Sequence, residues 1–156
     1  MPKQSAGLLV YRHRGSMLEV FLVHPGGPFW AKKDAGAWSI PKGEFAAEED
    51  ALAAARREFT EETGMVVDEP FASLGTIRQA GGKTIHGFSA TADFDADKIV
   101  SNTFSLEWPP RSGRSAEFPE VDRASWFSLE AAAEKINPAQ VEFLMRLRAA
   151  LDHPTV

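Results

Sequence analysis

Short runs of apolar and β-branched residues alternate with polar or glycine-containing segments along the first half of the chain. The runs 6–11 and 18–23 flank a glycine-containing turn at 12–16, a pattern typical of a β-hairpin. The next segment, 24–37, is rich in glycine and proline and carries two aromatic residues, so we expect a long, functional loop there. A short strand is expected at 38–40.

Strand patterns recur in the second half of the chain. They cover 71–79, 84–94, 103–108 and 125–127, and a polar, basic loop is expected at 109–119. Strands flanked by helices predict an α/β layer fold, and a chain of 156 residues is long enough to bury a core as a single domain.

The strongest helical pattern begins at Glu48 and ends near Thr63. Acidic residues crowd its start, alanine and leucine fill it, and Gly64 supplies the stop that a left-handed residue gives after a helix. Two more helices are predicted near the C-terminus. Ser128 caps the first, and Asn137, which a proline follows at the first helical position, caps the second.

Composition narrows the classes of function. The chain has 17 Lys and Arg against 22 Asp and Glu, a formal net charge of −5 that argues against a general nucleic-acid-binding surface. The lack of cysteine excludes disulfide scaffolds, thiolate nucleophiles and cysteine-ligated zinc, and is compatible with the reducing cytoplasm, where we expect the protein to act. Apolar stretches of about half a dozen residues are far shorter than the ~20 that span a bilayer, so we expect a soluble protein without a membrane partner.

The negative charge is concentrated in one window. Seven acidic and two basic residues lie in 43–65, which therefore carries the whole net charge. A helical wheel places Glu58, Glu61 and Glu62 on one face, where like charges destabilise a helix. A bound cation would neutralise these carboxylates, and ligands that are all oxygen favour Mg²⁺ or Mn²⁺ over zinc.

The spacing within this window matches a known motif. Gly43 is followed after five residues by Glu49, and after seven more by REFTEETGM at 57–65, which agrees with the Nudix box at every defined position. The chain therefore resembles the Nudix hydrolases. This resemblance implies an α/β/α sandwich built on a mixed sheet, and hydrolysis of a nucleoside diphosphate linked to another group. Gly43, Glu49 and Gly64 would shape the motif, with Glu49 positioning the helix and its preceding loop.

The same resemblance implies a role for each charged residue of the motif. Glu58 and Glu62 would be the principal metal ligands, Glu61 would assist, and the backbone carbonyl of Lys42 would be a further ligand. Arg57 would orient Glu58 through a charge-assisted hydrogen bond. A metal ion here would reverse the local sign of charge, bridge phosphate oxygens and lower the pKa of an attacking water.

A general base is also required. In several Nudix enzymes it is a glutamate outside the box, shortly before a strand that contains tryptophan. Glu120 lies six residues before Trp126 and is our first candidate, and Glu117 is the second. Both could instead be ordinary loop acids, in which case Glu58 itself could act as the base.

The segment WSIPKG at 38–43 resembles three Nudix branches. These are the dinucleoside polyphosphate hydrolases, the diphosphoinositol polyphosphate hydrolases and the RNA 5′-pyrophosphohydrolases. Lys42 would neutralise a phosphate of a polyphosphate chain. Some dinucleoside polyphosphate enzymes carry a tyrosine about 17 residues past the box, whereas Tyr11 is the only tyrosine here.

A nucleobase would therefore need another stacking partner. Phe29, Trp30 and His86 are candidates for that role, although each is also a normal packing residue. Arg111 and Arg114, near Glu120 in the sequence, are candidate phosphate clamps, or else solvated loop charges.

Three functions remain in competition. The first is an Mg²⁺-dependent hydrolase of a nucleoside polyphosphate, above all a dinucleoside polyphosphate similar to diadenosine tetraphosphate. The second is the same enzyme class acting on diphosphoinositol polyphosphate or on the 5′ end of RNA, which fits less well because the surface outside the box has no net positive charge. The third is a nucleotide-binding sensor without turnover, which the retention of all three box carboxylates disfavours. The sequence leaves the oligomeric state open.

Overall fold

The computed structural model describes residues 3–152, which form a mixed sheet with helices on both faces. The elements in chain order are β1 (Gln4–Arg14), β2 (Met17–Pro25), β3 (Lys42–Glu44), α1 (Ala51–Thr63), β4 (Ala72–Gln79), β5 (Lys83–Thr91), η1 (Ala96–Lys98), β6 (Thr103–Glu107), β7 (Ser115–Pro119), β8 (Val121–Ser128), α2 (Leu129–Lys135), η2 (Pro138–Gln140) and α3 (Val141–Asp152). The main sheet has the order β4-β5-β1-β2-β8, with β3 also paired to β1. Strands β1 and β5 run parallel and the other neighbours antiparallel, so the sheet is mixed, as predicted.

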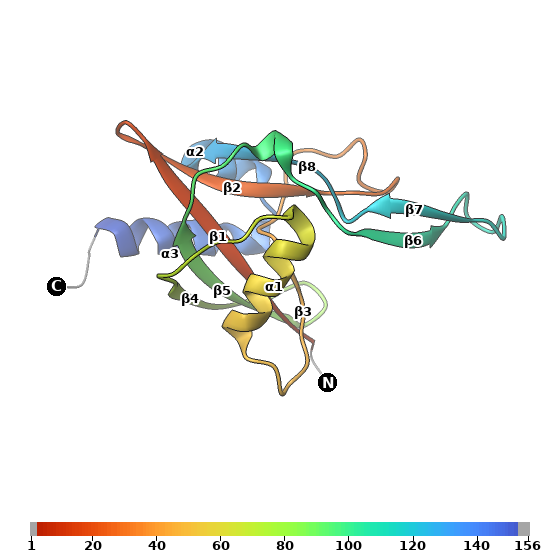
Figure 1. The fold of residues 1–156 in the computed structure, drawn as a ribbon, viewed down its shortest axis with the longest axis horizontal. Helices are drawn as coiled ribbons and strands as arrows, with labels where there is room; N and C mark the ends of the chain where they lie inside the picture. Colours follow the sequence, from red (N-terminus) through yellow and green to blue (C-terminus); the bar gives the residue numbers. More distant parts are fainter. Residues whose placement is uncertain (1–2, 153–156) are drawn as a thin grey trace.

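Strand β1 changes partner along one edge. Residues 11–14 pair with β2, which confirms the predicted hairpin, whereas residues 5–7 pair with β3. β1 and β2 therefore splay apart away from their turn (Figure 1), and the segment 38–44 lies between them. The candidate site forms at this split edge.

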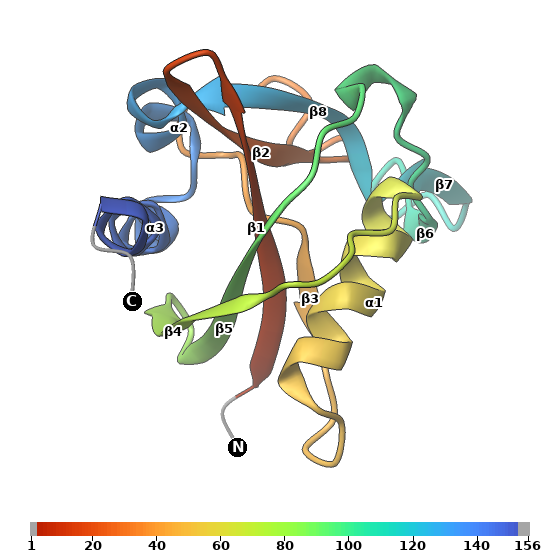
Figure 2. The same cartoon turned by 60° about the vertical axis from the view of Figure 1, so that its left-hand side comes forward.

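The sheet separates two helical layers. Helix α1 packs on one face, and α2 and α3 pack on the other (Figure 2). The alternation along β1 explains the arrangement, because successive side chains of a strand point to opposite faces. Ala6, Leu8 and Val10 are buried on the α1 side, whereas Leu9 is buried on the other. The α/β/α sandwich predicted from the resemblance is confirmed.

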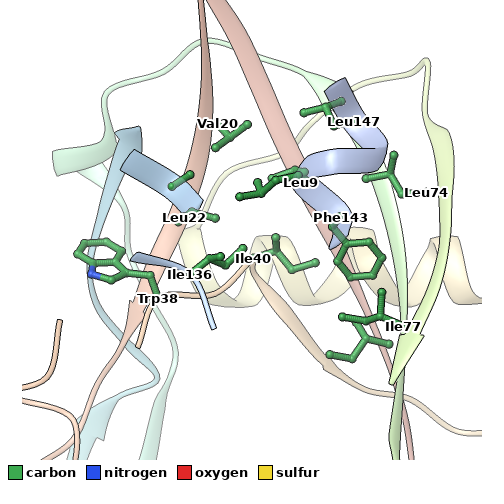
Figure 3. Close-up of a cluster of buried hydrophobic side chains, with 13 residues drawn as sticks. Leu9, Val20, Leu22, Trp38, Ile40, Leu74, Ile77, Ile136, Phe143 and Leu147 are labelled. Carbon is green, nitrogen blue, oxygen red and sulfur yellow. The ribbon is translucent and has the colours of Figure 1, made fainter. Parts of the chain in front are cut away.

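The core beneath α2 and α3 is dominated by aliphatic side chains. Figure 3 shows Leu9, Val20 and Leu22 of the sheet facing Phe143 and Leu147 of α3. Phe143 and Leu147 are completely buried. Burying each such side chain stabilises the fold by about 1.5–3 kcal/mol, so this layer holds the sheet rigid behind the site.

Helix α1 begins later than its sequence pattern indicates. Glu48 and Glu49 precede it, Asp50 is the N-cap and accepts from the Ala53 N–H at 3.0 Å, and the first turn contains no acid. The expectation of acidic residues in that turn is therefore wrong. The predicted stop is confirmed, because Gly64 has φ 73 and donates its N–H to the Thr60 carbonyl.

Two further expectations differ from the structure. The segment 109–119 is not all loop: β7 pairs with β6 in a hairpin that projects from the body of the molecule (Figure 1). Trp38 and Ser39 form only isolated bridges, and the strand lies at β3 instead, because β1 captures residues 42–44 as its partner. No helix within residues 3–152 is long and apolar enough to cross a membrane.

Candidate active site

An arginine–carboxylate network organises the exposed side of α1. The Arg57 guanidinium donates from Nη1 to Glu58 Oε1 at 3.0 Å and grips the Glu49 carboxylate through Nε and Nη2, each at 3.1 Å. Longer bonds of 3.3 and 3.4 Å reach Glu61. Glu58 is 9% exposed, so its carboxylate is held between this arginine and the sheet. The hydrogen bond from Arg57 to Glu58 expected from the motif is present.

Strand β3 brings the backbone against these carboxylates. Gly43 pairs with Ala6 of β1, and a Cβ at Gly43 would overlap the carboxylate of Glu58. Only glycine leaves room for that side chain. The neighbouring Lys42 N–H donates to Glu62 Oε1 at 3.3 Å, which ties β3 to the last turn of α1.

Glu120 reaches the same place through a relay of backbone hydrogen bonds. The Asn102 N–H donates to the carbonyl of Glu61 at 2.9 Å, and the Asn102 carbonyl accepts from the Glu120 N–H at 2.8 Å. The Glu120 carbonyl in turn accepts from the Gly26 N–H at 2.9 Å. These bonds join α1, the segment before β6, the β7–β8 junction and the end of β2, and they hold Glu120 beside the box acids.

Burial and mutual repulsion disfavour ionisation of three carboxyl groups here. Burial, and then the charges of Glu58 and Glu120, raise the pKa of Glu62 to about 8. Burial and the charge of Glu61 raise the pKa of Glu58, although Arg57 opposes this, and they raise the pKa of Glu120 as well. A bound cation would therefore stabilise the ionised form of these crowded carboxyl groups.

Two cationic groups frame the carboxylates. Hydrogen bonds and charge from its glutamate partners raise the pKa of Arg57, Glu49 having the largest effect, so it stays charged. Burial lowers the pKa of the Lys42 ammonium, against the attraction of Glu62. The Lys42 ammonium therefore lies partly shielded from water, close to the carboxylate of Glu62.

A cleft of about 220 Å³ opens at the split between β2 and β3. Glu62, Glu120, Lys42 and Trp30 all line it, so the structure brings together four residues that are widely spaced in the sequence. The remaining lining residues include polar side chains and the ends of strands: Val23, Pro25, Ala37, Ser39, Ile40, Gln79, Val121, Asn137 and Gln140. The cleft therefore has an acidic end and an aromatic, amide-rich wall.

Other predicted residues do not reach the cleft. Arg111 and Arg114 lie in the exposed turn of the β6–β7 hairpin, and Glu117 is exposed on β7 opposite Ser105. His86 lies on β5 and bonds to Gln4 Oε1 at 2.7 Å, away from the cleft lining.

Among the polar cleft residues that were not predicted as part of the site, Gln140 is the most buried. Gln140 is 1% exposed, and its Oε1 accepts from the Ile40 N–H at 3.0 Å while its Nε2 donates to Ser39 Oγ at 3.0 Å. The sequence indicates only that Gln140 lies at the start of a helix, because its hydrogen-bond partners Ile40 and Ser39 are about 100 positions away. Its amide fixes the segment that leads into Lys42.

A second unpredicted residue is His24, for which the sequence shows no ligand spacing. It is completely buried at the end of β2. Its Nδ1 lies 2.8 Å from Asp122 Oδ1 and its Nε2 lies 2.6 Å from the Lys33 carbonyl. The ring also packs edge-on against Trp38. His24 therefore anchors the loop that carries Trp30 to β8.

The carboxylate oxygens of Glu58, Glu61 and Glu62 are ligands that suit a hard divalent cation. The three side chains do not, however, converge on one point. Among residues 3–152, no three Asp, Glu, His or Cys side chains are grouped closely enough to hold a metal ion in this conformation. Arg57 bonds to both Glu58 and Glu61 and draws them to its own side. The raised pKa values of Glu58 and Glu62 and the glycine cradle at Gly43 nevertheless fit an oxygen-ligated cation.

The site thus combines crowded carboxyl groups with a cleft that a lysine side chain lines, an arrangement suited to a cation and an anion together. A family model described as NUDIX domain matches residues 1–147, so the chain belongs to the Nudix family. The enzyme class expected from the motif, a Nudix pyrophosphohydrolase, is confirmed. A comparison with curated proteins gave no significant match.

Solved structures share the fold over almost the whole chain. Ap4A hydrolase from C. elegans, in a binary complex, is 23% identical with a TM-score of 0.67, and the match covers 96% of this chain and 98% of that one. The NUDIX domain of Shewanella oneidensis NrtR, complexed with ADP ribose, is 17% identical with a TM-score of 0.68 over 97% and 89%. The Nudix hydrolase RenU from M. smegmatis is 20% identical with a TM-score of 0.63 over 98% and 88%.

Proposed function

We propose that this enzyme hydrolyses a pyrophosphate linkage in a nucleoside polyphosphate, with dinucleoside polyphosphates such as diadenosine tetraphosphate as the preferred class. The observation that carries the proposal is the cleft in which Glu62 and Glu120 face the same space as Lys42 and Trp30. An acidic end suits a metal-bound phosphate, a lysine suits a polyphosphate chain, and an indole suits a nucleobase. The fold shared with C. elegans Ap4A hydrolase is consistent with this substrate class.

Mg²⁺ is the proposed cofactor, with Mn²⁺ as the alternative. Glu58, Glu61, Glu62 and the Lys42 carbonyl would hold it. When bound, the ion supplies Lewis-acid chemistry and lowers the pKa of a coordinated water. The chain itself orients these carboxylates. A hydrogen bond from Arg57 fixes the orientation of the Glu58 side chain, and one from the Lys42 N–H fixes that of Glu62.

Glu120 is the proposed general base. Its pKa is raised by burial and by Glu61, and a carboxylate whose pKa lies closer to neutrality accepts a proton from water more effectively. Lys42 would neutralise a phosphate of the substrate, and Trp30 would stack on a base at the open end of the cleft. Diphosphoinositol polyphosphate and the RNA 5′ end are the alternative substrates that the lysine-bearing segment allows.

A substrate panel tests the proposal. Purified protein with Mg²⁺ is incubated with diadenosine tetraphosphate, ADP ribose, diphosphoinositol polyphosphate and triphosphorylated RNA, and the products are identified by mass spectrometry. We expect the fastest turnover with diadenosine tetraphosphate, and a loss of several orders of magnitude in Glu58→Gln. Glu130→Gln, at an exposed position on α2 on the other face of the sheet, is the matched control and should retain full activity. Tight nucleotide binding without turnover of any panel member would instead identify a sensor.

The cellular setting is part of the same proposal. We infer that residues 1–156 act as one domain in a reducing compartment, the cytoplasm, since the chain has no cysteine to stabilise it by disulfides. The two buried clusters flank a single sheet, which supports one cooperative unit. A single thermal transition, monitored both by circular dichroism and by tryptophan fluorescence, is the expected observation.

A further inference from the structure

Two neighbouring aromatic residues are exposed in the loop that borders the cleft. Phe29 is 61% exposed and Trp30 is 39% exposed, and within residues 3–152 no other aromatic side chain belongs to the exposed large hydrophobic residues. The loop is ordered by its own hydrogen bonds: the Trp30 N–H donates to the Gly27 carbonyl and the Lys33 N–H donates to the Trp30 carbonyl. Exposing two large rings at consecutive positions of the chain costs solvation free energy, which points to a ligand.

The two rings have different surroundings. Trp30 lines the catalytic cleft, whereas Phe29 does not and packs against Trp108 at the end of β6. The Phe29 and Trp108 rings have their centroids 5.6 Å apart and their planes at 84°, an edge-to-face pair. In this geometry the edge of one ring meets the face of the other, so the pair itself covers at most one ring face, and Phe29 remains 61% exposed.

The hairpin and the loop are built to keep this pair together. Gly27 lies against the ring of Phe104 on β6, where an added Cβ would come within 3.0 Å of Cζ. Phe104 in turn packs on Phe118 of β7. The Trp108 N–H donates to the Arg114 carbonyl at 2.9 Å and closes the end of the hairpin. These contacts fix the projecting β6–β7 hairpin so that Trp108 lies against Phe29 of the loop.

The charges around the pair suit a phosphate chain. Lys32 and Lys33 are exposed on the loop, and the Lys33 ammonium lies 5.0 Å from the centroid of the Trp30 ring. Arg111 and Arg114 are exposed in the hairpin turn, where the Glu107 carboxylate accepts from the backbone N–H of Arg111 at 2.9 Å. Four cationic side chains therefore lie on the same loop and hairpin as the two aromatic positions.

We propose that Phe29 and Trp108 form a second nucleobase-binding subsite, which takes the distal base of a dinucleoside polyphosphate whose other base stacks at Trp30. This inference rests on the function proposed above. Two bases joined by a flexible polyphosphate chain can reach neighbouring positions of one loop while the phosphates lie at Lys42 and the carboxylates. A mononucleotide occupies only the Trp30 position, so the second subsite selects for substrates with two nucleosides.

A pair of matched substrates isolates the subsite. Diadenosine tetraphosphate and adenosine 5′-tetraphosphate have the same phosphate chain and differ by one nucleoside. We expect Phe29→Ala and Trp108→Ala each to raise the KM for diadenosine tetraphosphate about tenfold, the effect typical of losing one stacked base. The KM for adenosine 5′-tetraphosphate should change by less than about twofold, and kcat should be unchanged for both substrates.

Further variants separate stacking from folding. Phe29→Leu keeps an apolar side chain without a ring face and should behave like Phe29→Ala, whereas Trp108→Phe should recover most of the wild-type KM. Met145→Ala removes an exposed apolar side chain on α3, outside the cleft lining, and is the matched control. Equal thermal midpoints for all variants would establish that the fold is intact.

The KM values for the two substrates decide whether the second subsite exists. An equal rise in KM for both substrates would show that the pair only positions Trp30, and unchanged KM values would show that it binds nothing; either result overturns the second subsite and leaves the proposed function standing. If wild-type enzyme cleaves no dinucleoside polyphosphate, the proposed function fails first and the subsite fails with it. A selective rise for the dinucleoside substrate, reversed in Trp108→Phe, supports it.

Discussion

The Arg57 guanidinium binds the Glu49 carboxylate through two parallel hydrogen bonds of 3.1 Å each, and so links α1 to the loop that precedes it. This bidentate contact leaves Nη1 of Arg57 directed at Glu58. The orientation of Glu58, a proposed metal ligand, therefore depends on a residue nine positions earlier in the chain that is not among the residues lining the cleft.

We expect Glu49→Gln to lower kcat by about tenfold, because a neutral amide cannot form the charge-assisted pair that fixes Arg57. KM should change little, since Glu49 does not line the cleft. Steady-state kinetics measure both quantities. Arg57→Lys, which keeps the charge but loses the planar fork, should show a similar or larger loss. Full activity in both variants would contradict the orienting role.

Gly43→Ala should lower activity strongly while leaving the fold intact. The added methyl group would overlap the Glu58 carboxylate and displace it, whereas the backbone of β3 can keep its pairing with β1. We expect a loss of at least about a hundredfold in kcat, the order of effect of misplacing a catalytic group, with circular dichroism unchanged. Glu44→Ala, at the neighbouring exposed position, is the control and should be active.

The stability of the metal-free protein should fall as pH rises from about 5 to 8. Glu62 has an ordinary pKa in the unfolded chain and a pKa of about 8 in the folded state, so the folded state binds more protons across this window. The stabilisation is fully present below the unfolded pKa and is lost as pH rises through 8. Thermal unfolding in chelator at several pH values measures the effect.

Two controls bear on this pH dependence. Glu62→Gln should flatten the curve, because the titrating group is gone. Mg²⁺ should raise the thermal midpoint more at pH 8 than at pH 6, since cation binding competes with protons for the same oxygens. A midpoint that is independent of pH in the wild-type protein would show that Glu62 ionises normally in the fold.

Glu120→Gln should lower kcat by about 10²–10⁴-fold, the usual contribution of a general base. KM should stay near the wild-type value if Glu120 acts only on water. Glu117→Gln should have no such effect, because its side chain is exposed on β7. The acidic limb of the pH–rate profile should disappear in Glu120→Gln alone. An unchanged kcat would transfer the role to Glu58 or Glu117.

Local patterns predicted most of the fold. Two apolar runs on either side of a glycine-containing turn placed the hairpin, and Gly64 and Asn137 marked a helix end and a helix start that the structure confirms. Apart from the start of α1, the expectations that were wrong concern which strands pair. Residues 115–119 lie in a segment rich in proline, serine and basic residues that predicts a polar loop, and they become β7 by pairing with β6.

The sequence by itself determined the box: the order of Gly43, Glu49, Arg57 and the three glutamates follows from covalent spacing and helical periodicity, which need no tertiary contact. The cleft, in contrast, is formed only by the tertiary structure. It exists because β1 changes partner, and because a relay of backbone hydrogen bonds through Asn102 carries Glu120 to α1. Contacts between residues tens of positions apart, such as Gln140 with Ile40 or Phe29 with Trp108, leave no local pattern and were decided only when the layers packed.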